Sequence, residues 1–297
     1  MSEKTAASTS MPKNKDKSVS PFKEALGRFF AKKSAVVGAV LLIVVVILTI
    51  LAPVIAPYNF ASTDITNMYG APTAQHLFGC DELGRDIFSR VLYGGRFSLQ
   101  IGLISSCSAA LGAIILGTIT GYIGGKADMI IMRILDVIQT IPGLLLSIAI
   151  SAVLGNGLYE TCIALAIGNL GGATRIYRAQ VMQIRGMDYI DAAVSDNTNP
   201  IRLTFKHIVP NSISPLIVNT TMNCAHDILT AATLSFIGLG VQPPNPEWGA
   251  MLSAGRNFIR EYPWMLIFPG LAILVTTLAL NLLGDGMRDA LDPKLKK

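Results

Sequence analysis

The chain has 297 residues, of which 51% are hydrophobic and only 14% are charged, and its mean hydropathy is +0.51. Soluble domains carry about one quarter charged residues, so this composition excludes an ordinary soluble domain and indicates a membrane protein. The formal charge of +5 does not indicate nucleic-acid binding, because the basic residues are spread between apolar stretches, where orientation in a bilayer explains them.

Six apolar stretches follow one another along the chain. Residues 1–33 are mostly polar and are expected to form a cytoplasmic tail that ends in a short surface helix. Residues 34–56 form the first predicted transmembrane helix, whose uncharged part from Ala35 to Ala56 is about 33 Å long, enough to cross a core of roughly 30 Å. Further spans are predicted at residues 98–125, 129–154, 161–182, 214–239 and 264–283.

The distribution of Lys and Arg predicts the orientation of these spans. With a cytoplasmic N-terminus, the outer loops, including the long loop 57–97, hold only five of the 24 basic residues: Arg85, Arg90, Arg96, Arg256 and Arg260. Basic residues accumulate on the cytoplasmic side of membrane proteins. Six spans therefore place both termini in the cytoplasm, together with the loop 183–212 and the tail 285–297, while the loop 240–263 lies outside.

Two features inside the spans concern helix packing. Gly117, Gly121 and Gly125 recur every four residues and allow another backbone to approach one helix face. That neighbour is either a helix of the same chain or a second subunit. Pro142 removes a backbone donor and is expected to bend the third span. The bend either belongs to a gate that moves during transport or only gives the helix a fixed bent shape.

The inner loop contains "DYIDAAVSDNTNPIRLTFKHIVPN" from Asp188 to Asn211. Its first part predicts a short helix with Tyr189, Ala192 and Ala193 on one face, and Asn197 and Pro200 interrupt it. A second amphipathic helix is expected to end at Pro210. Two helices joined by a sharp turn outside the bilayer are suited to docking into a groove of another protein. A solvated connector is the alternative.

This loop resembles the EAA loop of permease subunits of ABC importers, a pattern of Glu-Ala-Ala, three residues, Gly, nine residues and Ile-x-Leu-Pro. The corresponding residues here are Asp191-Ala192-Ala193, Asn197 and His207-x-Val209-Pro210. Asn replaces the turn glycine, which is reasonable because Asn is the next residue most able to adopt a positive φ. We therefore assign contact with an ATPase to Tyr189, Asp191, Ala192, Ala193, Asn197, His207 and Pro210.

Other segments extend the resemblance over most of the chain, specifically to the C-type permease of dipeptide, oligopeptide and nickel importers. They are "HLFGCDELGRDIFSRVLYGGRFSL", "MRILDVIQTIPGLLL", "LSFIGLG", "QPPNPEWGAML" and "NLLGDGMRDALDPKLK". The resemblance implies an all-α integral membrane protein of the type I importer permease fold, with six transmembrane helices, a five-helix core at residues 98–284 and a cytoplasmic EAA coupling helix.

The same resemblance implies a division of labour among subunits. A homologous permease would form the pathway with this chain, two ATP-binding subunits would drive it, and an extracytoplasmic binding protein would deliver short peptides. The chain has no G-x-x-x-x-G-K-[ST] phosphate loop, so ATP and Mg are expected on the partner subunits and no cofactor on this chain. Uptake of nickel or a metal chelate is an alternative, and a stand-alone secondary transporter is a further one.

Asp227 and His226 are adjacent in the middle third of the fifth predicted span. A charge at that depth is costly unless it is paired or faces water. Asp227 is therefore predicted either to line the substrate pathway, with His226 beside it, or to form a structural pair with an Arg or an amide. Two local arrangements are also expected. Arg133 pairs with Asp136, and Arg175 and Arg178 extend toward lipid headgroups or brace the inner loop rather than meet substrate.

The outer loop at residues 240–263 resembles a scoop over the mouth of the pathway. Glu247, Trp248 and Arg256 are the candidates for contact with the binding protein, and anchoring at the membrane interface is the alternative for the aromatic residues. No metal site is predicted, because the three histidines, His76, His207 and His226, fall in different compartments of this topology.

Overall fold

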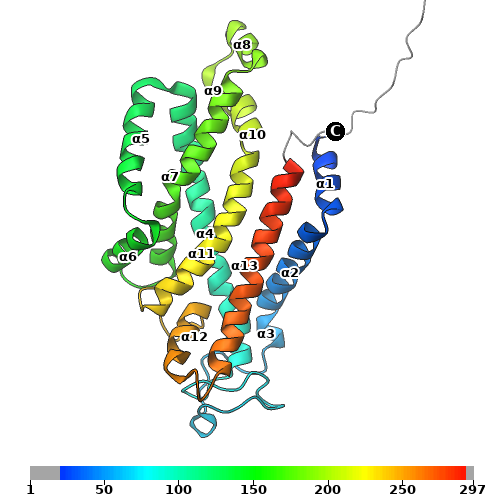
Figure 1. Cartoon of the computed structure of the whole chain (residues 1–297), viewed down its shortest axis with the longest axis vertical. Coiled ribbons are helices and arrows are strands. Elements are labelled where there is room, and N and C mark those ends of the chain that lie inside the picture. The colour runs from blue at the N-terminus through cyan, green and yellow to red at the C-terminus, as the bar shows by residue number, and fades with distance from the viewer. Residues whose placement is uncertain (1–20, 292–297) are drawn as a thin grey trace, which may run out of the picture.

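The computed structural model describes residues 21–291, and within that range the chain is helical, with its longest helices running side by side (Figure 1). The longer helices are α2 (Lys33–Ile50), α4 (Ile87–Thr118), α5 (Gly125–Gln139), α6 (Gly143–Leu154), α7 (Leu158–Arg185), α11 (Ser214–Phe236) and α13 (Trp264–Leu291). The shorter helical segments are α1 (Pro21–Ala31), α3 (Ala52–Ile55), η1 (Ile65–Asn67), η2 (Ile119–Ile123), α8 (Asp188–Ser195), α9 (Pro200–Leu203), η3 (Thr204–Ile208), α10 (Val209–Ser212), α12 (Trp248–Gly255) and η4 (Arg256–Phe258).

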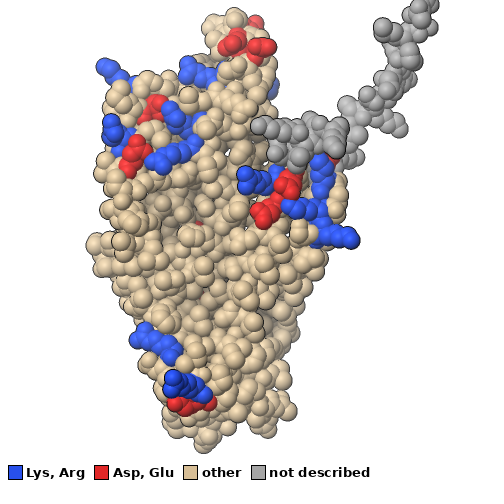
Figure 2. Space-filling model, viewed as in Figure 1, with Lys and Arg blue, Asp and Glu red and all other residues tan. Residues whose placement is uncertain are grey.

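The helices divide the molecule into two polar ends and an apolar middle. Figure 2 shows charged side chains gathered at the two ends, with a wide band between them that is nearly free of charge. Among the described helices, three are long and apolar enough to cross a membrane, namely α2, α4 with η2, and α13, and a fourth span results if α5 and α6 are taken together. α7 and α11 are also long, but they carry more polar residues and pack between the others.

All six predicted spans are found as helical segments, and the largest boundary difference concerns the second. α4 begins at Ile87 rather than near residue 98, so the predicted outer-loop residues Arg90 and Arg96 lie on the helix. Asp86 sets this start by accepting a hydrogen bond from the backbone N–H of Ser89 at 2.7 Å. Hydropathy missed the first turns of α4 because they carry both arginines.

The third predicted span is two helices. α5 and α6 meet at the Thr140–Pro142 break and are inclined to each other by 88°. The predicted bend at Pro142 is therefore confirmed, and it is much sharper than the bend of a continuous helix. Its two alternative roles, a moving gate and a static shape, both stay predictions.

The glycines of α4 make an internal contact, which is the first of the two predicted alternatives. A Cβ on Gly117 would lie 2.8 Å from the ring of Tyr177, and one on Gly121 would lie 2.8 Å from Val181, both on α7. Close approach of α4 and α7 therefore requires glycine at both positions. Gly125 does not take part, because it is the first residue of α5, with a φ of +59°, and a Cβ there would meet no atom within 4 Å.

The N-terminal helices pack on one side of the core. α2 lies against α13, where Gly38 and Gly286 allow the helices to approach closely, and Lys32 forms an ion pair with Asp289. α1 confirms the predicted short helix, whereas the predicted tail before it, at residues 1–20, lies outside the described range. At the other terminus α13 continues to Leu291, so the tail predicted from residue 285 begins as helix.

Candidate coupling and pathway sites

The loop between α7 and α11 folds into a compact knob at one end of the molecule, which we call the α8–α10 knob (residues 188–212; Figure 1). α8 ends in a Schellman motif: Asn197 N–H donates to the carbonyl of Val194 at 3.0 Å, and Thr198 N–H donates to that of Ala193 at 3.1 Å. Asn197 has a φ of +54°, which confirms its predicted turn conformation. Asn199 then caps α9 by accepting from Ile201 N–H at 2.9 Å.

The second part of the knob corrects one expectation. Pro210 was predicted to end the helix, but the helix continues through it to Ser212. The preceding turn, Thr204–Ile208, is a π turn in which Val209 N–H donates to the carbonyl of Thr204. Such a wider turn makes room for the proline ring, which would otherwise meet the carbonyl four residues earlier. His207 lies in this π turn and is half-buried.

One face of the knob is attached to α7. Ile190, Leu203 and Ile208 are buried against Tyr177, Val181 and Ile184 of α7. Ser212 Oγ also donates to the Tyr177 hydroxyl at 3.0 Å. This packing fixes the knob to the end of α7, and only Ile213 separates it from α11. A force on the knob would therefore reach both helices.

The opposite face of the knob is exposed and contains large apolar side chains. Tyr189 and Val194 on α8 are exposed, and Ile201 and Phe205 are 69% and 71% exposed. Of the predicted coupling residues, Tyr189, Asp191, Ala192, Asn197 and Pro210 are exposed, while Ala193 and His207 are intermediate. Val194, Ile201 and Phe205 were missed by the sequence reasoning. Their apolar character beside a turn, outside any predicted span, is the signal that could have found them.

Asp227 lies at the junction of three helices and is fully buried. Its carboxylate accepts hydrogen bonds from Ser105 Oγ on α4 and from Asn169 Nδ2 on α7, each at 2.6 Å. The structure thus shows the amide contact that was one of the two predicted alternatives. With both oxygens satisfied inside the chain, the carboxylate in this conformation holds α4, α7 and α11 together.

His226, unlike its neighbour Asp227, is exposed. It belongs to a polar stripe at spacings of three and four residues on one side of α11: Asn219, Asn223, His226, Thr230 and Thr233. His226 Nε2 lies 3.4 Å from Thr230 Oγ1, and Asn223 donates to Asn219 at 3.2 Å. A polar stripe of this length does not face hydrocarbon, so it borders water or another subunit. The sequence reasoning considered only His226, although the spacing of the others was visible.

A cavity adjoins the end of this stripe nearest the knob. It measures about 420 Å³ and is formed by α7, α11 and α13, with Ile176, Asn219, Met222 and Arg288 among its lining residues. Asn219 therefore belongs to both the stripe and the cavity wall. The polar face of α11 is continuous with a hollow that opens beside the polar end of α13.

Two of the three basic residues of α7, Arg175 and Arg178, pair across to α5 rather than extending toward lipid headgroups. Arg175 donates to Asp136 at 2.5 Å, and Arg178 donates through two nitrogens to Asp128 at 2.7 and 2.6 Å. The predicted local pair of Arg133 with Asp136 is therefore wrong, because Asp136 is taken by a residue 39 positions away. Spacing along one helix could not show that α5 folds back onto α7.

Two of the three candidates for contact with a binding protein are buried. Glu247 accepts from Ser98 Oγ at 3.1 Å and caps α12 through Ala250 N–H at 2.9 Å, and Trp248 donates to the carbonyl of Val91 at 2.9 Å. Neither side chain is available to a partner in this conformation, because each is at most 2% exposed. Arg256 is exposed and bonds to the carbonyl of Phe236.

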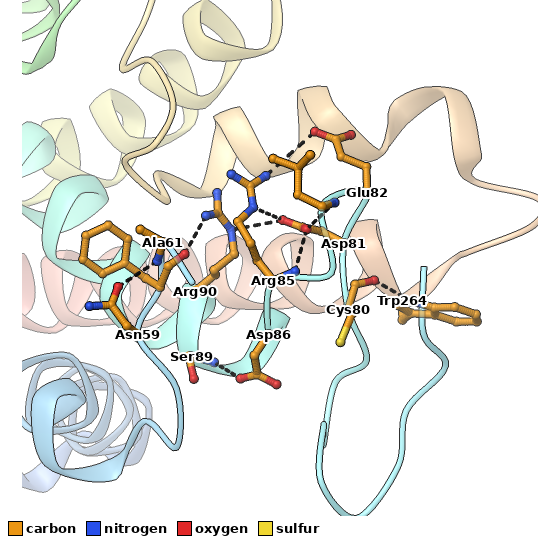
Figure 3. A network of polar contacts seen from close by, with 12 residues as sticks. Asn59, Ala61, Cys80, Asp81, Glu82, Arg85, Asp86, Ser89, Arg90 and Trp264 are labelled. Carbon is orange, nitrogen blue, oxygen red and sulfur yellow. Dashed lines mark hydrogen bonds and ion pairs between the residues drawn. The ribbon is translucent and has the colours of Figure 1, made fainter. Parts of the chain in front are cut away.

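The loop before α4 holds a network of buried charges (Figure 3). Asp81 accepts from Arg85 Nε at 2.7 Å and lies 3.5 Å from Arg90 Nε, while Arg90 donates to the carbonyl of Phe60 at 2.9 Å. Trp264 donates to the carbonyl of Cys80 at 3.3 Å. Burial, with Asp86 and Asp81 nearby, raises the pKa of the Cys80 thiol to about 11, so this thiol stays protonated. The charged groups of this network are therefore satisfied within the chain.

Within residues 21–291 there is no group of three or more His, Cys, Asp or Glu side chains that could hold a metal ion. His76 bonds to Asp86 at 3.0 Å at the start of α4, at the opposite end of the molecule from the knob that contains His207 (Figure 1).

Comparison with known proteins adds to this geometry. Residues 113–297 match the family described as "Binding-protein-dependent transport system inner membrane component", and residues 20–72 match the "N-terminal TM domain of oligopeptide transport permease C". The chain belongs to this family of transport permeases. It is accordingly a multi-pass inner-membrane protein, and its apolar band agrees with that location.

Curated relatives cover nearly the whole permease. The dipeptide transport system permease protein DppC of Alkalihalophilus pseudofirmus is 42% identical over 96% of this chain and 94% of its own length. The glutathione transport system permease protein GsiD of Pectobacterium atrosepticum is 42% identical over 96% of each chain. The oligopeptide transport system permease protein OppC of Bacillus subtilis is 40% identical over 95% of this chain and 92% of its own length.

The permease also resembles a solved structure. An inward-facing form of the MetNI methionine ABC transporter matches with a TM-score of 0.55 at 17% identity, covering 68% of this chain and 97% of the other. At this identity the likeness shows the fold alone, which is the type I importer permease fold expected from the sequence.

Proposed function

We propose that this permease forms, with a homologous permease, the membrane pathway of an ATP-driven importer of short peptides. Two ATP-binding subunits would drive transport, and an extracytoplasmic binding protein would deliver the substrate. The names of the relatives support the substrate class, since dipeptides, oligopeptides and glutathione are all short peptides or peptide-like molecules.

The α8–α10 knob is the element that couples ATP hydrolysis to transport. The observation that carries this proposal is the contrast between its two faces: one is packed on α7, and the other exposes Val194, Ile201 and Phe205 at the polar end of the molecule. An exposed apolar patch outside the bilayer is suited to a protein partner. An ATPase that holds this face would move α7 and α11 together when it closes.

The polar stripe of α11 lines the pathway between the two permeases. Its five residues lie on one side of the helix, and the stripe leads to the cavity next to Arg288. Asp227 would then support the pathway by fixing α11 against α4 and α7, while His226 would face it. Glu247 and Trp248 would act in the same indirect way at the outer mouth, leaving Arg256 as the candidate for contact with the binding protein.

The knob is assigned to the cytoplasmic side, together with both termini. The excess of basic residues on that side supports this orientation. The ATPases, with their ATP and Mg, would therefore meet the knob in the cytoplasm, and the loop before α4 would face the binding protein.

The proposal is tested by reconstituting the importer from a tagged form of this permease, its companion subunits and the binding protein. Uptake of labelled alanyl-alanine into proteoliposomes is measured with ATP inside, together with ATP hydrolysis. Phe205→Ser is compared with Phe30→Ser, because both phenylalanines are exposed but Phe30 lies on α1 rather than on the knob.

Uptake is expected only when every component and ATP are present. Phe205→Ser should lower uptake and the amount of ATPase recovered with the tag by about tenfold, in the range of a contact residue of an interface, and Phe30→Ser should change neither. Uptake by this permease alone, or an unchanged Phe205→Ser complex, would contradict the proposal.

A further inference from the structure

A second cavity lies at the break between α5 and α6. It measures about 450 Å³, within the range of small-molecule sites, and its wall includes Asp136, Gln139, Thr140, Pro142, Gly168 and Arg175. Unlike the apolar grooves along α4 and α13, this cavity has a guanidinium and a carboxylate at its edge. The Oε1 atom of Gln139, also in the wall, is buried without a hydrogen-bond partner in the described part of the chain.

Arg175 lies in the part of α7 nearest the knob. It is ten residues, or about 15 Å, from the end of α7 at Arg185, and Arg178 lies between it and that end. This part of α7 therefore belongs to the polar end of the molecule rather than to the apolar band.

At this position the ion pair of Arg175 and Asp136 is only half covered. Each side chain is 47% exposed, whereas the neighbouring pair of Arg178 and Asp128 is 27% and 23% exposed. Charges of this exposure are stable inside a membrane only if they face water or protein. The next residue, Ile176, lines the cavity that holds Asn219 of the α11 stripe, so the two cavities adjoin consecutive residues of α7.

We infer that the cavity at the α5–α6 break is a substrate subsite, in which Arg175 receives the C-terminal carboxylate of a peptide on its way through the importer. Asp136 is the positioning residue that holds the guanidinium until the carboxylate replaces it. The planar guanidinium can bind a carboxylate through two parallel hydrogen bonds, and the displaced Asp136 carboxylate, which is 47% exposed, is then solvated by water. The inference rests on the proposed function and names a residue that recognises its substrate.

The test uses the complete reconstituted importer and labelled alanyl-alanine. Arg175→Gln should lower uptake about tenfold or more, since a hydrogen bond to a charged group has an effect of that size on an equilibrium constant. Asp136→Asn should lower uptake less, because it leaves the guanidinium in place. Arg178→Gln is the matched control from the neighbouring pair, which does not line the cavity, and should change uptake by less than about threefold.

A structural pair gives a different pattern. If Arg175→Gln, Asp136→Asn and the double variant all lower uptake equally, the pair only joins α5 to α7, and the inference is wrong. It is equally wrong if Arg175→Gln leaves uptake unchanged, or if this variant recovers less of the partner permease with the tag, which would indicate a subunit contact. Failure of the unaltered importer to take up the peptide would instead overturn the proposed function.

A second measurement does not depend on a variant. Alanyl-photoleucine, a dipeptide with a light-activated side chain, is supplied with the binding protein and ATP to the unaltered importer and then irradiated. Label on residues 136–146 or 168–175 of this permease is expected, and excess alanyl-alanine should remove it. Label confined to other segments would contradict the inference.

Discussion

At the end that carries the loop before α4, charged side chains are buried against one another, whereas at the opposite end the α8–α10 knob leaves large apolar side chains exposed. Asp81, Arg85 and Arg90 satisfy each other within the chain, but Ile201 and Phe205 have no such cover. The buried charges of the first end are satisfied in a single chain, although Ile65 and Leu77 of its loop are also exposed, whereas the exposed side chains of the knob have the composition of an interface. Substitutions at the first should therefore affect stability, and substitutions at the second should affect assembly.

The largest effect on stability is expected from Asp81→Ala. Arg85 and Arg90 would remain buried without their shared carboxylate, and breaking a buried ion pair in this way costs about 3–5 kcal/mol. Unfolding of the purified permease in a denaturing detergent titration measures this loss. Asp191→Ala on the knob is the control and should cost less than about 0.5 kcal/mol, as an exposed substitution does.

Asp227→Ala should destabilise the permease by about 1–3 kcal/mol, because it leaves the half-buried amide of Asn169 without its acceptor. Ser105 Oγ would keep the carbonyl of Ile101 as an acceptor at 2.7 Å. Asp227→Asn retains an acceptor and should cost less than half as much. The same titration compares the two variants. Equal stability of Asp227→Ala and the unaltered chain would show that the junction of α4, α7 and α11 does not depend on this carboxylate.

A smaller loss of stability is expected from a substitution in the turn of the knob. Asn197 has a positive φ, and a β-branched residue in that conformation costs about 1–2 kcal/mol, so Asn197→Val should weaken the turn. Asn197→Gly should be tolerated. Hydrogen exchange of the amides of α8 and α9 reports the turn directly, and unchanged protection in Asn197→Val would contradict the conformation described for Asn197.

The smallest effect on stability is expected from Phe205→Ser. The ring is exposed, so its removal should change the free energy of unfolding by less than about 0.5 kcal/mol, even though it reduces recovery of the ATPase. A clear loss of stability in the isolated permease would mean that the exposed face of the knob contributes to the fold, and the contrast between the two ends would fail.

Local patterns were sufficient to predict much of the fold. Apolar length located the six helical segments, Pro142 marked the break between α5 and α6, and Asn197 marked the turn of the knob. These features depend on neighbouring residues, whose spacing and backbone preferences are visible in the sequence.

Contacts between distant segments could not be predicted in this way. Asp136 was assigned to Arg133, three residues away, but pairs with Arg175 on another helix. Glu247 and Trp248 were assigned to the surface, but they are buried against Ser98 and Val91 on α4. A polar residue next to a turn has the same local pattern whether it meets a partner protein or a helix of its own chain.

The most direct test of the central claim is a crosslink from the knob. Ala192→Cys, in a form of the permease in which the four natural cysteines are replaced, is treated in membranes with a short bifunctional thiol reagent together with ATPase subunits that carry single cysteines. A crosslinked product that contains the ATPase, and whose yield changes when ATP is added, is the result predicted here. An Ala192→Cys thiol that reacts freely with a soluble maleimide but never captures an ATPase would contradict the account.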